Sequence, residues 1–382
     1  MMYDAHRYTL LNQEELCEDP KFLQEQLITY IGNKRTLLPS IGKAIESIKK
    51  RTSKPKLACL DLFAGTGIVS RYLKKHSSVL VANDIELYSK ITNECYLTNK
   101  QDVSTKRLKE AFRYISQRLS SGMKEGFIAE LYAPADDKNI KHGERVFYTR
   151  RNAAYIDTVR QLIEDVDSDL QYFLLSPLLA EASVHANTSG VFKGFYKSKQ
   201  GIGQFGGHGQ NALSRILKDI ELRSPIFSNF ECRTTVHQMD ANAFVATRSD
   251  MDFDVAYLDP PYNQHPYGSN YFMLNLIAQY ERPDDISKVS GIPAVWNRSQ
   301  YNKKQYAKEA LFEIIEKCNA KFIIISYNSE GFIKKEDFLR YMKKIGTVYD
   351  VFETTYNTFR GSRNLGDRPI HVTEFLYLLE KN

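Results

Sequence analysis

Four consecutive residues, Asp259-Pro260-Pro261-Tyr262, directly follow the apolar run at 253–258 and form a stiff segment rich in hydrogen-bond acceptors. Each proline fixes φ and removes a backbone donor, so the carbonyls here stay free to accept. An amino group on a planar ring is a poor nucleophile because its lone pair is delocalised. The Asp259 carboxylate and the Pro260 carbonyl can bind its two hydrogens, and Tyr262 can stack on the ring. These residue types predict a site that orients a ring amino group toward a methyl donor.

A glycine-rich turn, Asp61-Leu-Phe-Ala-Gly-Thr-Gly67, follows a predicted strand at 57–62 and precedes a predicted helix. Glycines let the backbone turn sharply and approach a ligand, and the helix start supplies free N–H groups. Asp84 closes the next predicted strand, the position that binds ribose hydroxyls in nucleotide-binding sheets. The turn lacks the third glycine of a dinucleotide fingerprint, and Asp61 would repel a pyrophosphate. A ligand with a ribose and a cationic group, such as a sulfonium amino acid, suits this turn better.

Alternating apolar runs and helical patterns surround these motifs and predict an α/β fold with a mostly parallel sheet. Strands are expected at 57–62, 79–82, 232–236, 253–258 and 322–326, followed by an antiparallel hairpin of 348–352 and 373–378. Helices are expected at 68–75 and 86–99, and an amphipathic helix is built on Leu37, Leu38, Ile41, Ala44, Ile45 and Ile48. Between 101 and 225 the alternation lapses, which predicts an inserted domain of helices and loops. Residues 1–100 and 226–382 then form the other domain.

A third motif, Tyr30-Ile-Gly32-Asn33-Lys34, precedes the amphipathic helix. A glycine turn with a lysine can bind a carboxylate through its charge and its backbone N–H groups, although an ordinary turn is the simpler interpretation of this motif alone. In this order along the chain, the three motifs resemble those of the DPPY-type N6-adenine DNA methyltransferases with the alpha arrangement. That family includes Dam-like enzymes and the methylases of restriction–modification systems.

The resemblance implies a Rossmann-like, mostly parallel seven-stranded sheet of the S-adenosylmethionine-dependent methyltransferase type, with a mainly helical target-recognition domain inserted at 101–225. It implies S-adenosyl-L-methionine as methyl donor, S-adenosyl-L-homocysteine as product, and no metal. The expected substrate is double-stranded DNA, from which the target adenine is flipped out of the stack. A restriction endonuclease is the expected functional partner, and a monomer the expected state.

The resemblance also implies roles for individual residues. The cofactor-binding set is Tyr30, Lys34, Asp61, Phe63, Gly65, Asp84, Asp240 and Asp259. Lys34 is expected near the cofactor's carboxylate, Asp84 at its ribose, and Asp240 at its adenine amino group, with a helix cap as the alternative for Asp240. Asp259, Pro260 and Tyr262 are expected to hold the target base. Asn33 stands where many relatives have a second glycine, and because Asn tolerates left-handed backbone angles the turn is expected to survive.

Three segments are candidate DNA contacts, each with a solvated or packed loop as the alternative. The first, at 191–199, interleaves lysines with aromatic residues; the second lies between the last two predicted strands, and the third follows the catalytic tetrapeptide. The candidate residues are Lys193 and Lys197, Arg360 and Arg363, and Tyr267 and Asn270, respectively. In the first segment the lysines would meet phosphates, and the aromatic residues or Asn187 could reach base edges.

The bulk composition is compatible with this interpretation. A net charge of +6 permits a phosphate-bearing partner without requiring one. No run of eighteen apolar residues and no secretory signal is present, so a cytoplasmic protein without a membrane span is expected. The five cysteines are dispersed, which argues against a zinc site or a disulfide framework.

Several alternative functions remain open at this point. An amino methyltransferase acting on RNA adenine or on the N4 atom of DNA cytosine would use the same loop geometry. Asp at position 259, where Ser is the other choice, favours adenine, and the large insert favours duplex DNA. A non-catalytic DNA-binding scaffold would not need Asp259 and Tyr262, and an oxidoreductase is disfavoured by Asp61.

Overall fold

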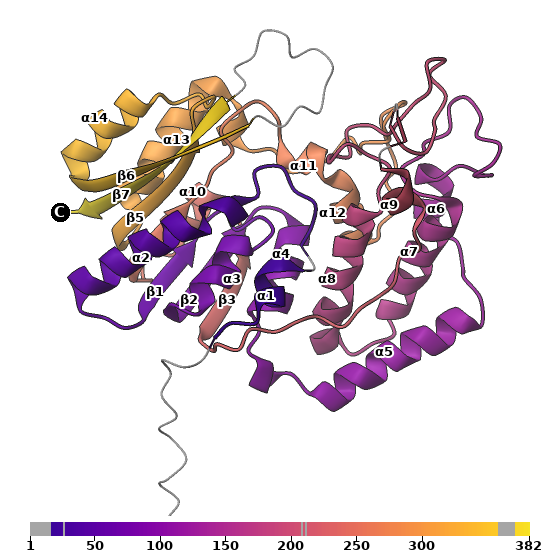
Figure 1. The fold of residues 1–382 in the computed structure, drawn as a ribbon, viewed down its shortest axis with the longest axis horizontal. Coiled ribbons are helices and arrows are strands. Elements are labelled where there is room, and N and C mark those ends of the chain that lie inside the picture. The colour runs from indigo at the N-terminus through magenta and orange to yellow at the C-terminus, as the bar shows by residue number, and fades with distance from the viewer. Residues whose placement is uncertain (1–16, 26, 208, 211, 358–370) are drawn as a thin grey trace, which may run out of the picture.

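A seven-stranded sheet with the strand order β3-β2-β1-β4-β5-β7-β6 forms the centre of the fold (Figure 1). The computed structural model describes residues 17–25, 27–207, 209–210, 212–357 and 371–382. The strands are β1 (Leu57–Asp61), β2 (Ser77–Asp84), β3 (Arg233–Gln238), β4 (Phe253–Leu258), β5 (Ala320–Asn328), β6 (Gly346–Asn357) and β7 (His371–Lys381). Strands β1 to β5 are parallel, and β7 pairs antiparallel with β5 and β6. The predicted mostly parallel sheet and C-terminal hairpin are confirmed, with longer hairpin strands than expected.

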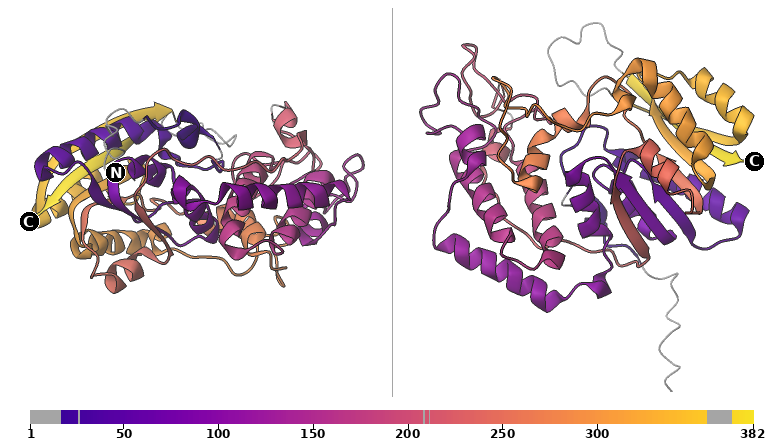
Figure 2. Two further views of the ribbon diagram at one scale, coloured as in Figure 1. Left: turned by 90° about the horizontal axis from the view of Figure 1, so that it is seen from below. Right: turned by 180° about the vertical axis from the view of Figure 1, so that it is seen from behind.

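Helices cover both faces of the sheet because successive apolar side chains of the central strands point to opposite faces. In β4, Val255 and Tyr257 join one core, while Ala256 and Leu258 join the other. The first face carries α2 (Leu38–Thr52) and α3 (Ile68–Lys74), and the second carries α10 (Ala241–Thr247), α13 (Lys304–Lys317) and α14 (Lys335–Ile345) (Figure 2). Helix α2 is the predicted amphipathic helix, and its apolar stripe is buried.

Strands β1, β2 and β4 lie side by side and end at the same edge of the sheet. Asp61 is the last residue of β1, Asp84 is the last of β2, and Asp259 follows β4 directly. The strand order reverses at β1, since β2 lies on one side of it and β4 on the other. In open α/β sheets, ligands bind at such a reversal, beyond the carboxyl ends of the strands. The three predicted acidic residues therefore meet where this architecture places a ligand.

The chain between β2 and β3 builds a second, helical core beside the sheet (Figure 1). Its helices are α5 (Thr105–Ser120), α6 (Phe127–Tyr132), α7 (Arg150–Ile163), α8 (Ser168–Val184) and α9 (Leu213–Leu217). The same core contains side chains of α4 (Leu87–Leu97) and α12 (Phe272–Gln279), which precede and follow the predicted insert. The helical character expected for 101–225 is present, while the bounds of an independent domain stay a prediction because the core is shared.

Short elements complete the described chain: α1 (Pro20–Gln24), η1 (Lys34–Leu37), η2 (Lys100–Asp102), α11 (Tyr267–Asn270) and η3 (Gln300–Asn302). The cysteines are free thiols, with Cys17 exposed and the other four buried. Among the helices of the described ranges, none has both the length and the apolar character that a bilayer span requires.

Candidate active site

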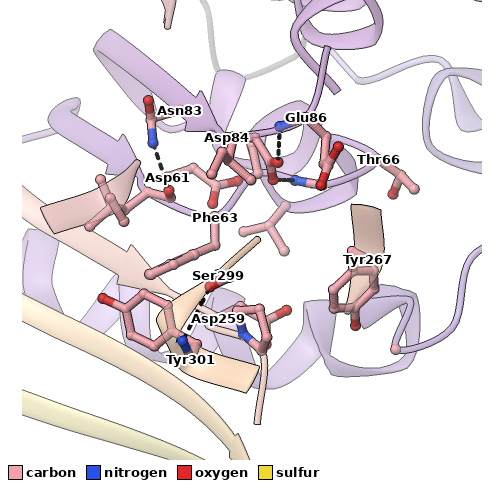
Figure 3. A pocket seen from close by; sticks show the side chains of 18 of the residues that line it. Asp61, Phe63, Thr66, Asn83, Asp84, Glu86, Asp259, Tyr267, Ser299 and Tyr301 are labelled. Atoms are coloured by element: carbon pink, nitrogen blue, oxygen red, sulfur yellow. Dashed lines mark hydrogen bonds between the residues drawn. The ribbon is translucent and has the colours of Figure 1, made fainter. Parts of the chain in front are cut away.

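One cavity at the carboxyl edge of the sheet brings the three sequence motifs together. Figure 3 shows side chains from β1, β2, the end of β4 and the segment before η3 converging around it. Its lining includes the whole predicted cofactor set: Tyr30, Lys34, Asp61, Phe63, Gly65, Asp84, Asp240 and Asp259. Since these residues come from distant parts of the sequence, their convergence makes the cavity the candidate active site.

Asp84 joins the turn after β1 to the end of β2. One of its carboxylate oxygens accepts from the Gly65 N–H at 2.8 Å, and the other accepts from the Glu86 N–H at 2.9 Å. Gly65 and Gly67 both have positive φ, and a Cβ at Gly67 would lie 2.5 Å from the side-chain oxygen of Asn93. The turn therefore needs glycine, as the sequence predicted, and each Asp84 oxygen keeps acceptor capacity for a hydroxyl group.

Asp61 places a buried and incompletely paired carboxylate on the cavity wall. The Ser70 hydroxyl donates to its Oδ2 atom at 2.6 Å. Its Oδ1 atom is buried and has no hydrogen-bond donor among the residues that the structure describes. Burial raises the pKa of Asp61 to about 7, and the negative charges of Asp259 and Asp84 add to the shift. An unpaired buried carboxylate oxygen is costly, so this wall fits a ligand that brings a cationic group.

Asp259 forms an ion pair with Lys34 of the Tyr30–Lys34 motif. The Lys34 ammonium lies 3.1 Å from Asp259 Oδ1 and 3.0 Å from Glu374 Oε1. Lys34 is buried, and the two carboxylates raise its pKa well above the usual value in spite of that burial. Burial also raises the pKa of Asp259, and the Lys34 charge opposes this shift. The expected position of Lys34 at a cofactor carboxylate stays a prediction; the contacts seen are to Asp259 and Glu374.

The segment after Asp259 is fixed from two sides. The Tyr262 carbonyl accepts from the Phe332 N–H at 3.1 Å, and the Asn263 carbonyl accepts from the Asn302 side chain at 2.8 Å. The Tyr262 ring meets the Tyr327 ring edge-on, at a centroid distance of 6.2 Å, and remains partly exposed. These contacts keep the loop stiff and leave the Tyr262 ring accessible for stacking.

Three tyrosine rings join the Tyr30–Lys34 motif to the chain that follows the Asp259 loop. Tyr30 stacks on Tyr267 at 5.0 Å and on Tyr271 at 4.5 Å between ring centroids. Tyr267, a candidate DNA contact in the sequence, lies on the cavity wall in this structure. Asn270 is buried, and its carbonyl accepts from the Phe192 N–H at 2.7 Å. The DNA-binding roles of Tyr267 and Asn270 stay predictions, and Asn270 needs a local rearrangement to meet DNA.

Two further predictions concern residues of the cavity wall, Asn33 and Asp240. The turn at Gly32 and Asn33 is present, as expected. Gly32 has the left-handed φ of 78°, and Asn33 has a φ of −57°. Asn33 instead caps η1, because its side chain accepts from the Arg35 N–H at 2.9 Å. The left-handed position of this turn is therefore Gly32, and the turn forms without a left-handed Asn33. Asp240 caps α10 through the N–H groups of residues 242 and 243 and also lines the cavity, so the two interpretations of Asp240 are compatible.

Comparison with known proteins agrees with this geometry. The model of the D12 class N6 adenine-specific DNA methyltransferases matches residues 30–340. The chain belongs to this family. The methyl donor that the family implies is S-adenosylmethionine.

Curated relatives of this methyltransferase match over most of its length. It is 32% identical to the type II methyltransferase M.NlaIII of Neisseria lactamica, over 93% of this chain and 99% of that protein. It is 29% identical to the type II methyltransferase M.CviAII of Paramecium bursaria Chlorella virus 1, over 84% of this chain and 89% of the relative. It is 28% identical to the type II methyltransferase M.FokI of Planomicrobium okeanokoites, of whose length the chain spans 52%.

Two acidic residues at or beside this cavity, Glu86 and Glu374, were not predicted from the sequence. Glu86 lines the cavity, and its Oε2 atom accepts from the side chains of Asn275 at 2.6 Å and Asn297 at 3.0 Å. Burial raises the pKa of Glu86 to about 7, with a further contribution from Asp84. Its place directly after a strand end was a usable signal. Glu374 on β7 had no local signal, because only the folded sheet brings it to Lys34.

The predicted DNA contacts of the methyltransferase fall into three groups. Lys193 and Lys197 are exposed on the loop after α8, as expected. Asn187 is fully buried, and its side chain bonds to the backbone of residues 146, 204 and 206, so the prediction that it reaches base edges was wrong. Arg360 and Arg363 lie outside the described residues.

Proposed function

We propose that this N6-adenine DNA methyltransferase is the modification enzyme of a type II restriction–modification system and methylates a flipped adenine in double-stranded DNA. The observation that supports this most directly is the cavity in which Asp61 and Asp84 face the fixed Asp259 loop. A cation-binding wall and an acceptor for an amino group thus share one enclosed space. The relatives named as type II methyltransferases support the assignment to such a system.

The residues of the cavity suit S-adenosylmethionine, which supplies an electrophilic methyl group on a positively charged sulfur. Asp84, together with Glu86, is proposed to bind the ribose hydroxyls, because both carboxylates line the cavity beside the Gly65 turn. Asp240 is proposed to accept from the adenine amino group of the cofactor. Tyr30 and Phe63 provide apolar walls, and Asp61 with its unpaired Oδ1 atom favours the cationic end.

Cofactor affinity is predicted to depend on the charge of Asp61. Since burial raises the pKa of this carboxyl to about 7, it is neutral below that pH and attracts a cation only above it. We expect calorimetry to show tighter binding of S-adenosylmethionine as pH rises from about 5.5 to about 7.5, by up to about tenfold per unit for one coupled group. Asp61→Asn should flatten this dependence. S-adenosylhomocysteine, without the sulfonium charge, is the control and should show a weaker slope; equal slopes for both compounds would contradict the role of Asp61.

The Asp259 loop is proposed to hold the target base. Asp259 and the carbonyl of Pro260 accept from the amino group and orient its nitrogen toward the methyl donor, so that catalysis rests on positioning and electrostatics. Flipping a base costs a few kcal/mol, and stacking on Tyr262 recovers about 1–3 kcal/mol. The partly exposed Tyr262 ring and the braced loop support this assignment.

The loop with Lys193 and Lys197 is proposed to contact DNA phosphates. We expect the Lys193→Ala/Lys197→Ala variant to bind DNA more weakly and to reduce the slope of log affinity against log salt concentration by up to about 2, from about 0.9 per phosphate contact. Fluorescence anisotropy across a salt series measures both quantities. Lys106→Ala/Lys109→Ala on α5, at the far end of the helical core, is the charge-matched control (Figure 1). An unchanged slope in the loop variant would move the DNA surface elsewhere.

The proposal as a whole is tested by sequencing DNA methylated by the purified protein at single-base resolution. N6-methyladenine at one short recurring sequence, in duplex but not in RNA, is the expected result. A product limited to N4-methylcytosine or to RNA would overturn it. A paired endonuclease is expected to cut that same sequence only when it is unmethylated. We propose that a monomer carries out the reaction, which sedimentation with and without DNA tests.

A further inference from the structure

Glu374 is a buried acidic residue on β7, an interior strand that lies between β5 and β6. It pairs across the sheet with Asn328 of β5 and Thr354 of β6, and is 1% exposed. Its neighbours on the same face of the strand, Val372 and Leu376, are buried apolar residues. Burying a carboxylate costs free energy unless it is paired and hydrogen-bonded, so the contacts of Glu374 need a specific explanation.

Glu374 is fixed by the strand beside it. The Ser326 hydroxyl donates to Oε1 at 2.8 Å, and the Asn328 side chain donates to Oε2 at 3.3 Å. Both donors lie on β5, in the centre of the sheet, so the carboxylate has a rigid support. Its Oε1 atom also lies 3.0 Å from the Lys34 ammonium.

Lys34 is therefore shared between a fixed carboxylate and the catalytic one. Its ammonium is 3.1 Å from Asp259 Oδ1 and at nearly the same distance from Glu374. This contact uses Oδ1 of Asp259 and leaves Oδ2 for a further donor, such as an amino group. If Glu374 did not attract Lys34, the buried ammonium would pair with Asp259 alone and compete with the amino group for that carboxylate.

We infer that Glu374 is a positioning residue for methyl transfer: it holds Lys34 against β7, so that Lys34 orients Asp259 without taking it from the target amino group. This inference rests on the proposed role of Asp259. Glu374 does not itself line the cavity, and it acts through Lys34, which does.

The charge of Glu374 also has an effect that a structural role alone would not have. The titratable groups that interact with the Lys34, Asp259 and Glu374 cluster are Asp61, Tyr257, Tyr262 and Tyr267, and the exposed Glu330 interacts with Tyr262. Among the charged neighbours of Asp259, Lys34 lowers its pKa and Glu374 raises it. Removing the charge of Glu374 therefore lowers the pKa of Asp259 and moves the acid limb of the kcat profile to lower pH.

The test compares Glu374→Gln, Glu374→Asp and Glu380→Gln in steady-state methylation of DNA across a pH series. Glu374→Gln keeps the size and the acceptor oxygen of the side chain, so it is expected to fold. We expect its kcat at pH 8 to fall about ten- to hundredfold, the cost of a small misplacement, with the KM for S-adenosylmethionine and DNA changed less than about threefold. The acid limb should shift downward, and Glu374→Asp should recover part of kcat. Glu380→Gln, on the same strand in a surface pair with Arg51, should match the parent protein.

Two outcomes would overturn the inference. One is a kcat of Glu374→Gln within twofold of the parent; the other is a fall in kcat with the acid limb unmoved, which indicates a merely structural role. If Glu374→Gln does not fold, as judged by circular dichroism and cofactor binding, Glu374→Asp decides, and a fully active, unshifted Glu374→Asp counts against the inference. Asp259→Ala separates the two hypotheses: an active Asp259→Ala refutes the proposed role of Asp259, whereas an inactive Asp259→Ala with a normal Glu374→Gln refutes only the role of Glu374.

Discussion

Replacing Asp259 with alanine is expected to lower the rate of methyl transfer by at least about 10²–10³-fold while leaving S-adenosylmethionine bound within a few-fold of its normal affinity. The reason lies in the geometry of the site. Asp259 follows β4 directly and pairs with Lys34, so in the proposed mechanism its carboxylate is a preorganised acceptor for the target amino group. Loss of one preorganised electrostatic group in an enclosed site typically costs this much. The other acidic residues of the cavity remain to bind the cofactor.

The measurement is single-turnover transfer of labelled methyl groups to DNA, with cofactor affinity determined separately by calorimetry. Asp252→Ala is the matched control, because Asp252 is exposed just before the other end of β4, far from the cavity. Its rate should equal that of the parent protein. A substantial rate in Asp259→Ala would contradict the catalytic assignment. Loss of both folding and cofactor binding would instead show that the loop mainly supports the structure.

The parts of the site that could be predicted from the sequence are those in which one short segment carries both the position and the chemistry. The turn at 61–67 and Asp84 follow apolar runs that predict strands. Because the carboxyl ends of parallel strands meet at one edge of a sheet, these residues were expected to lie together. The same reasoning placed Asp259 correctly on the cavity wall. The alternation of strands and helices along the chain also predicted the parallel part of the sheet. Its buried strands were recognisable because buried parallel strands are continuous apolar runs.

The remaining features of the site depend on contacts between segments that lie far apart in the sequence. Glu374 and Lys34 lie near opposite ends of the chain, and no local sequence pattern at either position predicts their contact. Asn297 reaches Glu86 from a loop without a recognisable motif. Asn187 was interpreted as an exposed base contact because it lies in a polar segment. In the fold it is a hydrogen-bond centre that holds the backbone of two loops together. A polar residue type alone does not distinguish these two uses.

Replacing Lys34 with methionine should have the largest effect on stability, about 3–5 kcal/mol at pH 8, because it leaves the buried carboxylate of Glu374 and the half-buried carboxylate of Asp259 without a cation. In the parent protein the pKa of Lys34 is raised, so its contribution is fully present below its usual pKa and is lost only as pH rises through the higher folded value. In Lys34→Met the carboxyls of Asp259 and Glu374 have raised pKa values in the folded state. Folding then favours their protonated forms, and stability falls as pH rises above the unfolded pKa of about 4.

The loss in Lys34→Met should therefore be larger at pH 8 than at pH 6, which urea unfolding at the two pH values measures. The double variant Lys34→Met/Glu374→Gln restores the formal charge of the cluster to −1, the same as one ammonium between two carboxylates. It should regain part of the lost stability but not the activity, since Asp259 still lacks the cation that orients it. The two substitutions touch the same cluster, so a non-additive result is the signature of their interaction. A loss below about 1 kcal/mol at pH 8, or a double variant less stable than the single one, would show that charge pairing does not hold this site together.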